Sequence, residues 1–199
     1  MPRTVWNVPN ILTALRIACI PVLVLVAYSG WPSRYLLAAS LFTLAAVTDW
    51  LDGYLARKLK QTSAFGRFLD PVADKLMVAA ALIVLVDWHH TVLLVIPAIV
   101  IVAREITISA LREWMAEIGK RASVAVSYIG KLKTTAQMLA IGMLLADQPV
   151  YDVHGQLVFS MLDLFSYLLL YVAVVLTLWS MLLYLKAAWP DLRRMDPQS

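Results

Sequence analysis

Residues 49–74 read DWLDGYLARKLKQTSAFGRFLDPVAD, and this stretch joins the end of one apolar run to the start of the next. It contains four aspartates, two on each side of a short polar connection: Asp49, Asp52, Asp70 and Asp74. Residues three or four positions apart share a face of an α-helix, so the two members of each pair point the same way. We therefore expect a helical hairpin whose two arms bring four carboxylates together.

The composition around this hairpin is that of a membrane protein. Hydrophobic residues make up 61% of the 199 positions, charged residues only 15%, and the mean hydropathy is +0.76, whereas soluble domains are about half apolar and a quarter charged. About 20 apolar residues cross a bilayer as a helix. The chain is therefore predicted to be an all-α integral membrane protein, a single domain over residues 1–199 with six transmembrane helices. We expect no nucleic-acid partner, and the lone Cys19 provides neither a disulfide nor a cysteine metal site.

Breaks in the apolar pattern separate the expected helices. The first break is the turn around Gly30 and Pro32, and the last is the segment around Asp147 and Pro149, because helices rarely continue through such residues. The apolar stretches between breaks cover residues 8–28, 34–56, 68–87, 91–112, 124–146 and 160–186.

The distribution of Lys and Arg predicts the orientation in a cell membrane, since cytoplasmic loops retain these residues and translocated loops avoid them. The basic residues gather in every second connection and at both ends of the chain: Arg3, Arg57, Lys58, Lys60, Arg67, Lys120, Arg121, Lys186, Arg193 and Arg194. Both termini are therefore expected in the cytoplasm. His89, His90 and His154 fall in connections on the other side, where we expect them to be solvated rather than to bind a metal.

Four carboxylates at membrane depth need a compensating charge. A charged side chain there is expensive and usually functional, and four like charges so close would repel one another unless a cation bound them. Oxygen ligands without histidine favour Mg²⁺ or Mn²⁺ over Zn²⁺, and Ca²⁺ is possible in a structural role. The alternative is that the aspartates form ordinary ion pairs at the helix ends, with Arg57, Lys58, Arg67 and Lys75 as partners.

Two glycines lie on the same helix faces as the aspartates. At Gly53 and Gly66 the missing side chain would allow a flat or bulky ligand to approach the backbone. Arg57 lies one turn beyond Gly53, where it could neutralise a phosphate. A diphosphate bridged by divalent ions fits these residues.

The complete spacing is Asp49-x-x-Asp52-Gly53-x-x-Ala56-Arg57, eight residues, then Gly66-x-x-x-Asp70-x-x-x-Asp74. This resembles, without a departure, the signature of the CDP-alcohol phosphotransferase family. The resemblance implies a fold of six transmembrane helices, two bound divalent ions and a homodimer. It also implies a reaction in which the substituted phosphate of a CDP-alcohol passes to a second alcohol and CMP is released.

The resemblance further implies roles for individual residues. Asp49, Asp52 and Asp70 would bind metal, and Asp74 would bind metal and act as the general base. The CDP-lipid would be contacted by residues of the first helix and of the hairpin: Asn10, Thr13, Gly53, Arg57, Ser63 and Gly66.

Three further segments are similar to the branch of the family that makes phosphatidylglycerophosphate. They are residues 7–21, which begin Asn7-Val8-Pro9-Asn10, residues 104–113, and residues 126–137. This similarity implies that the enzyme transfers the phosphatidyl group of CDP-diacylglycerol to glycerol 3-phosphate. The acceptor is a phosphate dianion, which calls for cationic side chains on the cytoplasmic side: Arg104, Arg112, Lys131 and Lys133. Arg104 lies within an apolar stretch, so it either binds substrate or pairs with an acid such as Glu105.

Several alternatives remain open from the sequence. Cardiolipin synthases share much of the branch pattern and use phosphatidylglycerol as the acceptor. Other members use inositol phosphate, as phosphatidylinositol phosphate synthases do, or serine. Intramembrane prenyltransferases also bind a diphosphate through aspartates and Mg²⁺, but their motif lacks the Gly-x-x-Ala-Arg element. A cation carrier or a membrane scaffold is the non-enzymatic alternative.

Overall fold

The structure is a computed structural model that describes residues 8–58, 64–118 and 128–193. Within these ranges the description does not extend to the side chains of 8–9, 50, 52–57, 64–65, 67, 128–129, 131 and 190–193. The described residues form six α-helices and one short β-hairpin. The helices are α1 (Val8–Ala27), α2 (Arg34–Lys58), α3 (Ala64–His89), α4 (Val92–Glu117), α5 (Tyr128–Ala146) and α6 (Met161–Arg193). The all-α prediction is therefore confirmed.

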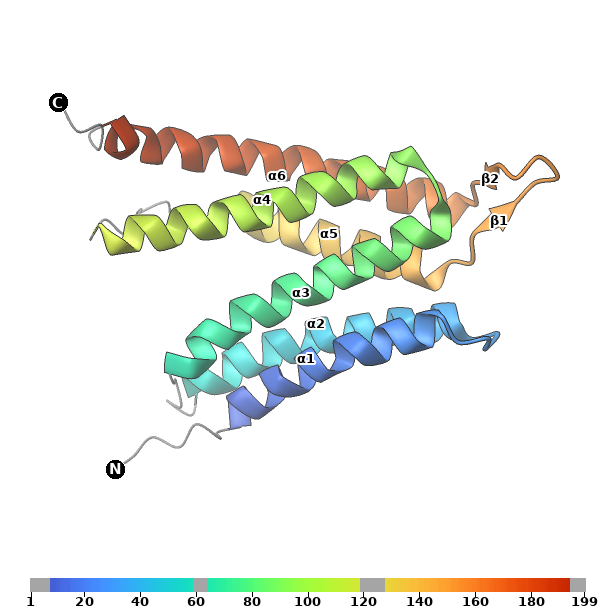
Figure 1. Cartoon of the computed structure of the whole chain (residues 1–199), viewed down its shortest axis with the longest axis horizontal. Helices are drawn as coiled ribbons and strands as arrows, with labels where there is room; N and C mark the ends of the chain where they lie inside the picture. The colour runs from blue at the N-terminus through green and yellow to red at the C-terminus, as the bar shows by residue number, and fades with distance from the viewer. Residues whose placement is uncertain (1–7, 59–63, 119–127, 194–199) are drawn as a thin grey trace.

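The helices run up and down as a single bundle (Figure 1). α1 packs against α2 and α3, α2 also packs against α5, and α6 packs against α4 and α5. The starts of α1 and α3 and the ends of α2, α4 and α6 lie at one end of the bundle, which we call the terminal end (Figure 1). The aspartate pairs of α2 and α3 therefore lie toward this terminal end.

A β-hairpin closes the opposite end of the bundle, which we call the hairpin end. β1 (Val150–Tyr151) pairs antiparallel with β2 (Leu157–Val158), and Val150 is opposite Val158. Gly155 in the connecting turn has φ +73°, a conformation that favours glycine because it has no Cβ. The sequence predicted only a connection in this region.

The core contains many small and aliphatic side chains. Alanines such as Ala38, Ala45 and Ala81 are almost completely buried, and small side chains allow two helix axes to approach closely. Phe42 and Leu82 fill the space between them. Many large apolar residues are exposed on the outside of the helices, as expected for a bundle surrounded by lipid.

Length and hydropathy qualify three of the helices of the described part as candidate membrane spans. They are α1 over residues 10–27, α4 over 92–117 and α6 over 161–189, and Leu132–Ala146 of α5 is a shorter apolar helix. α2 and α3 contain the charged residues of the aspartate signature, such as Asp49 and Asp74. These measures thus support a membrane protein without confirming all six predicted spans.

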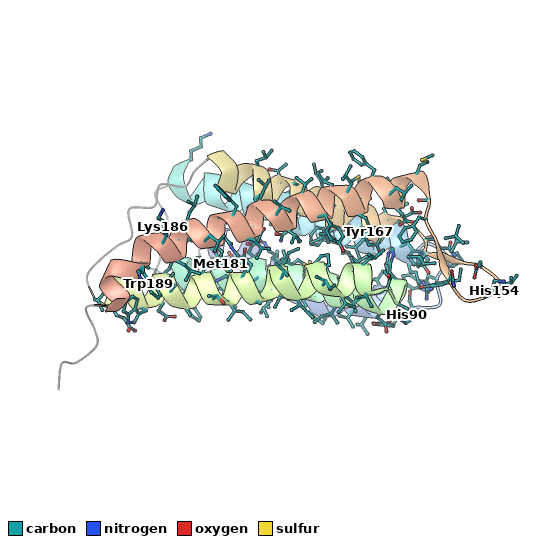
Figure 2. All side chains as sticks on the ribbon, turned by 90° about the horizontal axis from the view of Figure 1, so that it is seen from above. His90, His154, Tyr167, Met181, Lys186 and Trp189 are labelled. Carbon is teal, nitrogen blue, oxygen red and sulfur yellow. The ribbon has the colours of Figure 1, made fainter. Side chains whose placement is uncertain are left out.

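Figure 2 shows the two ends of the bundle by their side chains. His90 and His154 lie at the hairpin end, whereas Lys186 and Trp189 lie at the terminal end. Aromatic hydrogen bonds fasten the hairpin end, since Tyr151 donates its hydroxyl to the Trp88 carbonyl and Tyr28 donates to Asp87 across 2.9 Å. These contacts hold the neighbouring helices and the β-hairpin together at this end of the bundle.

The prediction that His89 is solvated is wrong. His89 is fully buried, and its Nδ1 lies 3.2 Å from the hydroxyl of Tyr167 on α6. The start of α6 covers the end of α3, and sequence position alone does not reveal this packing.

Candidate active site

The two aspartate pairs lie on facing helices, as the hairpin spacing predicts. Asp49 and Asp52 belong to the second half of α2, and Asp70 and Asp74 belong to the first half of α3. The side chains of Asp49, Asp70 and Asp74 are described, whereas that of Asp52 is outside the description. Asp49 lies within electrostatic range of Asp74. The prediction that the two helices bring acidic groups together is therefore supported for these two aspartates.

α1 presents a polar stripe to the aspartates. Asn10, Thr13 and Arg16 follow one another at intervals of three residues, and all three are at least 96% buried in a helix that is otherwise largely apolar. Thr13 donates its hydroxyl to Asp70 Oδ1 at 2.6 Å, and Arg16 pairs with Asp49 Oδ1 at 2.5 Å. The first helix thus forms one wall of the aspartate cluster.

Arg16 was not among the predicted site residues. It appeared in the sequence only as part of the opening segment 7–21, although a cation inside an apolar run, one turn from Thr13, was the signal that could have identified it. The alternative of ion pairs at the helix ends proposed other cations as partners of the aspartates. Lys75, one of them, donates instead to the hydroxyl of Ser109 on α4.

A polar cavity of about 340 Å³ opens beside Asp74. It is bounded by α3, α4, α5 and α6, so residues far apart in the sequence meet there. The described lining includes four cations and two acids: Lys75, Arg104, Arg112, Lys133, Asp74 and Glu105. With every group ionised, their formal charge is +2. We call this space the acceptor cavity.

The cations of the acceptor cavity are held by specific partners. Glu105 Oε1 accepts hydrogen bonds from Arg104 at 2.5 Å and from Lys133 at 3.2 Å. Arg104 also donates to the hydroxyl of Ser180 at 3.2 Å. Both cations are more than 90% buried, and a buried charge is tolerated when it is paired and hydrogen-bonded. The predicted pairing of Arg104 with Glu105 is therefore confirmed, and Arg104 also lines the cavity, whereas its binding of a substrate stays a prediction.

Arg112 lies at a more exposed part of the same cavity. It donates to the hydroxyl of Tyr184 at 2.5 Å, and its guanidinium lies 5.0 Å from the centre of the Tyr184 ring. A guanidinium stacked in this way keeps several N–H groups available for an anion. Tyr184 and Ser180, both on α6, were missed because nothing in the sequence distinguishes them from other polar residues of a spanning helix.

Some predicted residues lie outside what the structure describes. Ser63 lies in the segment between α2 and α3 that is not described, and only the backbone of Gly53, Arg57 and Lys131 is described, within α2 and α5. Gly66 is buried near the start of α3. The roles predicted for these residues, and for Asn10 and Thr13 toward the nucleotide, remain predictions.

The described aspartates offer the oxygen donors that suit a hard divalent ion, although among the described residues no group of three or more His, Cys, Asp or Glu side chains is arranged to bind a metal. Asp49, Asp70 and Asp74 offer only carboxylate oxygens, which suit Mg²⁺ or Mn²⁺. The side chain of Asp49 is 46% exposed, so the carboxylate that Arg16 contacts remains open on its other side. The structure does not include the side chain of Asp52, the fourth member of the predicted set.

An apolar groove runs beside the acceptor cavity. It lies between α2 and α5, and its lining includes Phe42, Val47, Leu139 and Gly142. Met138 lines both the groove and the acceptor cavity. A cavity with charged lining residues and an apolar groove thus adjoin each other.

Comparison with known proteins gives one consistent result. Residues 6–179 match the family model for CDP-alcohol phosphatidyltransferase. A protein of Pectobacterium atrosepticum is 54% identical over 187 residues, 94% of this chain and 97% of its own length. Proteins of Haemophilus influenzae and Pseudomonas fluorescens are each 51% identical, over 92% and 94% of this chain and 94% and 92% of their own lengths.

All three relatives are named CDP-diacylglycerol–glycerol-3-phosphate 3-phosphatidyltransferase. The alignments include both the aspartate hairpin and the helices that line the acceptor cavity, because they cover nearly the whole chain. The family model alone spans most of the 199 residues. This chain belongs to the CDP-alcohol phosphatidyltransferase family.

Proposed function

We propose that this chain transfers the phosphatidyl group of CDP-diacylglycerol to glycerol 3-phosphate, forming phosphatidylglycerophosphate and releasing CMP. The observation that carries the proposal is the acceptor cavity, in which Asp74 lies beside four cations. A phosphate monoester dianion would balance the formal charge of +2 on the lining. The relatives named for this reaction, at 51–54% identity over nearly their whole length, support the same substrates.

The charge and size of the cavity favour a small phosphate such as glycerol 3-phosphate over serine and phosphatidylglycerol, and the names of the relatives favour glycerol 3-phosphate over inositol phosphate. Serine carries no net charge, and phosphatidylglycerol carries one negative charge and two acyl chains. A cavity of about 340 Å³ is at the small end of ligand sites, and its polar lining suits a small hydrophilic molecule. Arg104 and Lys133 would bind the phosphate, and the hydroxyl to be phosphatidylated would point toward Asp74.

The chemistry assigned to the chain is a single displacement at phosphorus. The acceptor hydroxyl attacks the phosphorus on the lipid side of the diphosphate, its proton passes to the carboxylate of Asp74, and the bond to the phosphate of CMP breaks. In-line placement of nucleophile and leaving group is the main requirement of such a transfer.

Two Mg²⁺ or Mn²⁺ ions are part of the proposal. Asp49, Asp52, Asp70 and Asp74 would bind them, and Thr13 would orient Asp70 through the 2.6 Å hydrogen bond. When bound, such ions neutralise the negative charge of the diphosphate oxygens. The support is the hard-oxygen donor set on two facing helices.

The proposal includes the arrangement in the membrane. Six spans with both termini in the cytoplasm would put the terminal end, and hence the aspartates, on the cytoplasmic side, where glycerol 3-phosphate is available. Lys58 and Lys186 lie toward this end, in agreement with the preference of basic residues for the cytoplasm. A homodimer remains a prediction from the family resemblance.

One assay tests the function directly. Purified protein in detergent is incubated with CDP-diacylglycerol and, separately, glycerol 3-phosphate, phosphatidylglycerol, inositol phosphate or serine, with Mg²⁺ or with EDTA. We expect CMP and phosphatidylglycerophosphate only with glycerol 3-phosphate and Mg²⁺. The proposal would be contradicted by cardiolipin formation from phosphatidylglycerol or by equal activity in EDTA. In a separate incubation with a prenyl diphosphate, release of pyrophosphate would also contradict it.

A further inference from the structure

Arg16 is a buried cation near the middle of a helix that is long and apolar enough to span a membrane. Only 2% of the residue is exposed, and it lies within the span 10–27 of α1. A guanidinium stays charged under all conditions in which proteins are folded, and a buried charge is strongly destabilising without compensation. Its position therefore requires an anionic counterpart in the folded protein.

That counterpart is the aspartate cluster. Arg16 contacts Asp49 Oδ1 at 2.5 Å, and it lines a small cavity of about 10 Å³ together with Asp74 and Met138. The side chain of Arg16 is 1% exposed, whereas that of Asp49 is 46% exposed. The cation thus lies on the interior side of the aspartates, and their other side remains open.

We propose that Arg16 is a resident counter-ion of the aspartate cluster, a fixed positive charge that balances Asp49 and Asp74 when no divalent ion is bound. The inference rests on the metal site of the proposed function. It adds a property that the site itself does not require, because a fixed cation would keep α1, α2 and α3 packed together when no ion is bound. Between successive substrates, Arg16 would therefore offset the repulsion among the aspartate carboxylates.

A fixed cation at this position has a cost for metal binding. Arg16 repels a divalent ion that approaches the same carboxylates, and this repulsion is only partly screened in the protein interior. Free ions are therefore bound more weakly than the aspartates alone would allow. The diphosphate of the substrate adds negative charge and offsets the repulsion, so tight metal binding depends on the nucleotide.

Replacing Arg16 separates this role from simple packing. In Arg16→Met, the affinity for Mn²⁺ without nucleotide should increase by about tenfold, because the repulsion is gone. The same variant should unfold at a temperature on the order of 10 °C lower than the parent protein in EDTA, and saturating Mn²⁺ should restore most of the difference. Arg16→Lys, which keeps the charge, should behave like the parent protein in both measurements.

The experiment uses the full-length protein in detergent. Free Mn²⁺ is measured by electron paramagnetic resonance during a titration, and thermal unfolding is followed with EDTA and with Mn²⁺. Thr13→Val is the matched control, because Thr13 is equally buried, lies one turn away on the same face and bonds to Asp70, but is uncharged. This control should bind Mn²⁺ no more tightly than the parent protein, and Mn²⁺ should not restore the stability that it loses.

Three outcomes would overturn the inference. One is weaker or unchanged Mn²⁺ binding by Arg16→Met, and another is an equal loss of thermal stability with and without Mn²⁺. The third is that Arg16→Met cannot be purified even with Mn²⁺ present throughout, while Arg16→Lys can, since the ion then cannot replace the cation. Failure of the proposed function looks different, because the parent protein would then not bind Mn²⁺ even with CDP-diacylglycerol present.

Discussion

Lys133 on α5 donates a hydrogen bond to Glu105 on α4, with 3.2 Å between Nζ and Oε1. The same oxygen of Glu105 accepts from Arg104, so one carboxylate keeps two cations together at the wall of the acceptor cavity. Without this carboxylate, the positive charges of Arg104 and Lys133 would repel each other. Glu105 therefore organises the cationic pair that we assign to the acceptor phosphate.

Lys133→Met should raise the KM for glycerol 3-phosphate by roughly ten- to a hundredfold, the loss expected for a hydrogen bond to a charged group. The KM for CDP-diacylglycerol should change by less than about twofold, because a contact made only with the acceptor does not affect the other substrate. Steady-state release of CMP with each substrate varied in turn measures both values. Lys186→Met is the control, since this exposed lysine lies at the same end of the bundle and does not line the cavity.

Arg112→Ala should also raise the KM for glycerol 3-phosphate far more than the KM for CDP-diacylglycerol. Tyr184→Phe keeps the ring under the guanidinium and removes only the hydroxyl that Arg112 contacts, so its effect should be a few-fold at most. The same CMP assay compares the two variants. Equal increases in both KM values for Arg112→Ala would argue against a separate acceptor cavity.

Asp74→Asn should lower the turnover rate roughly a hundred- to ten-thousandfold if Asp74 acts as a general base. Some binding of CDP-diacylglycerol should remain, because the cations of the cavity and the other aspartates are unchanged. Single-turnover release of CMP and equilibrium binding of the labelled lipid test the two parts separately. Full activity of this variant would remove Asp74 from the proposed chemistry.

Ser160→Ala should destabilise the fold without affecting catalysis. Ser160 and Asp163 cap the start of α6 reciprocally, since Ser160 Oγ accepts from the Asp163 N–H at 2.9 Å and Asp163 Oδ2 accepts from the Ser160 N–H at 3.1 Å. Loss of such a cap costs about 1 kcal/mol, which corresponds to a fall of about 2–4 °C in Tm for a chain of this size. Thermal unfolding in detergent measures the change, and Ser160→Thr should retain most of the stability. A large loss of CMP release would contradict the structural role of the hairpin end.

The helices could be predicted from the sequence because their signals are local. The first stretch was expected at 8–28 and is observed as Val8–Ala27, and the fifth was expected at 124–146 and is observed as Tyr128–Ala146. Apolar length and the turn residues that interrupt it determine such boundaries. The strands of the β-hairpin were missed because each has two residues and depends on its pairing partner.

The candidate site was predicted in part. Arg104, Arg112 and Lys133 were expected near the acceptor and line one cavity with Asp74. Arg16 was missed, because its importance depends on which face of α1 meets α2. His89 was misjudged for the same reason, since its burial follows from the packing of α6 over the end of α3.

The sequence by itself determined that the fold is built of apolar helices, how the aspartates are spaced, and which family the chain resembles. Apolar length and motif spacing are properties of neighbouring residues along one chain. Only the tertiary structure decided that Arg16 serves as the partner of Asp49, and that Glu105 gathers Arg104 and Lys133 beside Asp74. The physical reason is that the rotation of each helix about its axis is set by packing against its neighbours. Which charges meet across a bundle is therefore fixed only when all the helices are in contact.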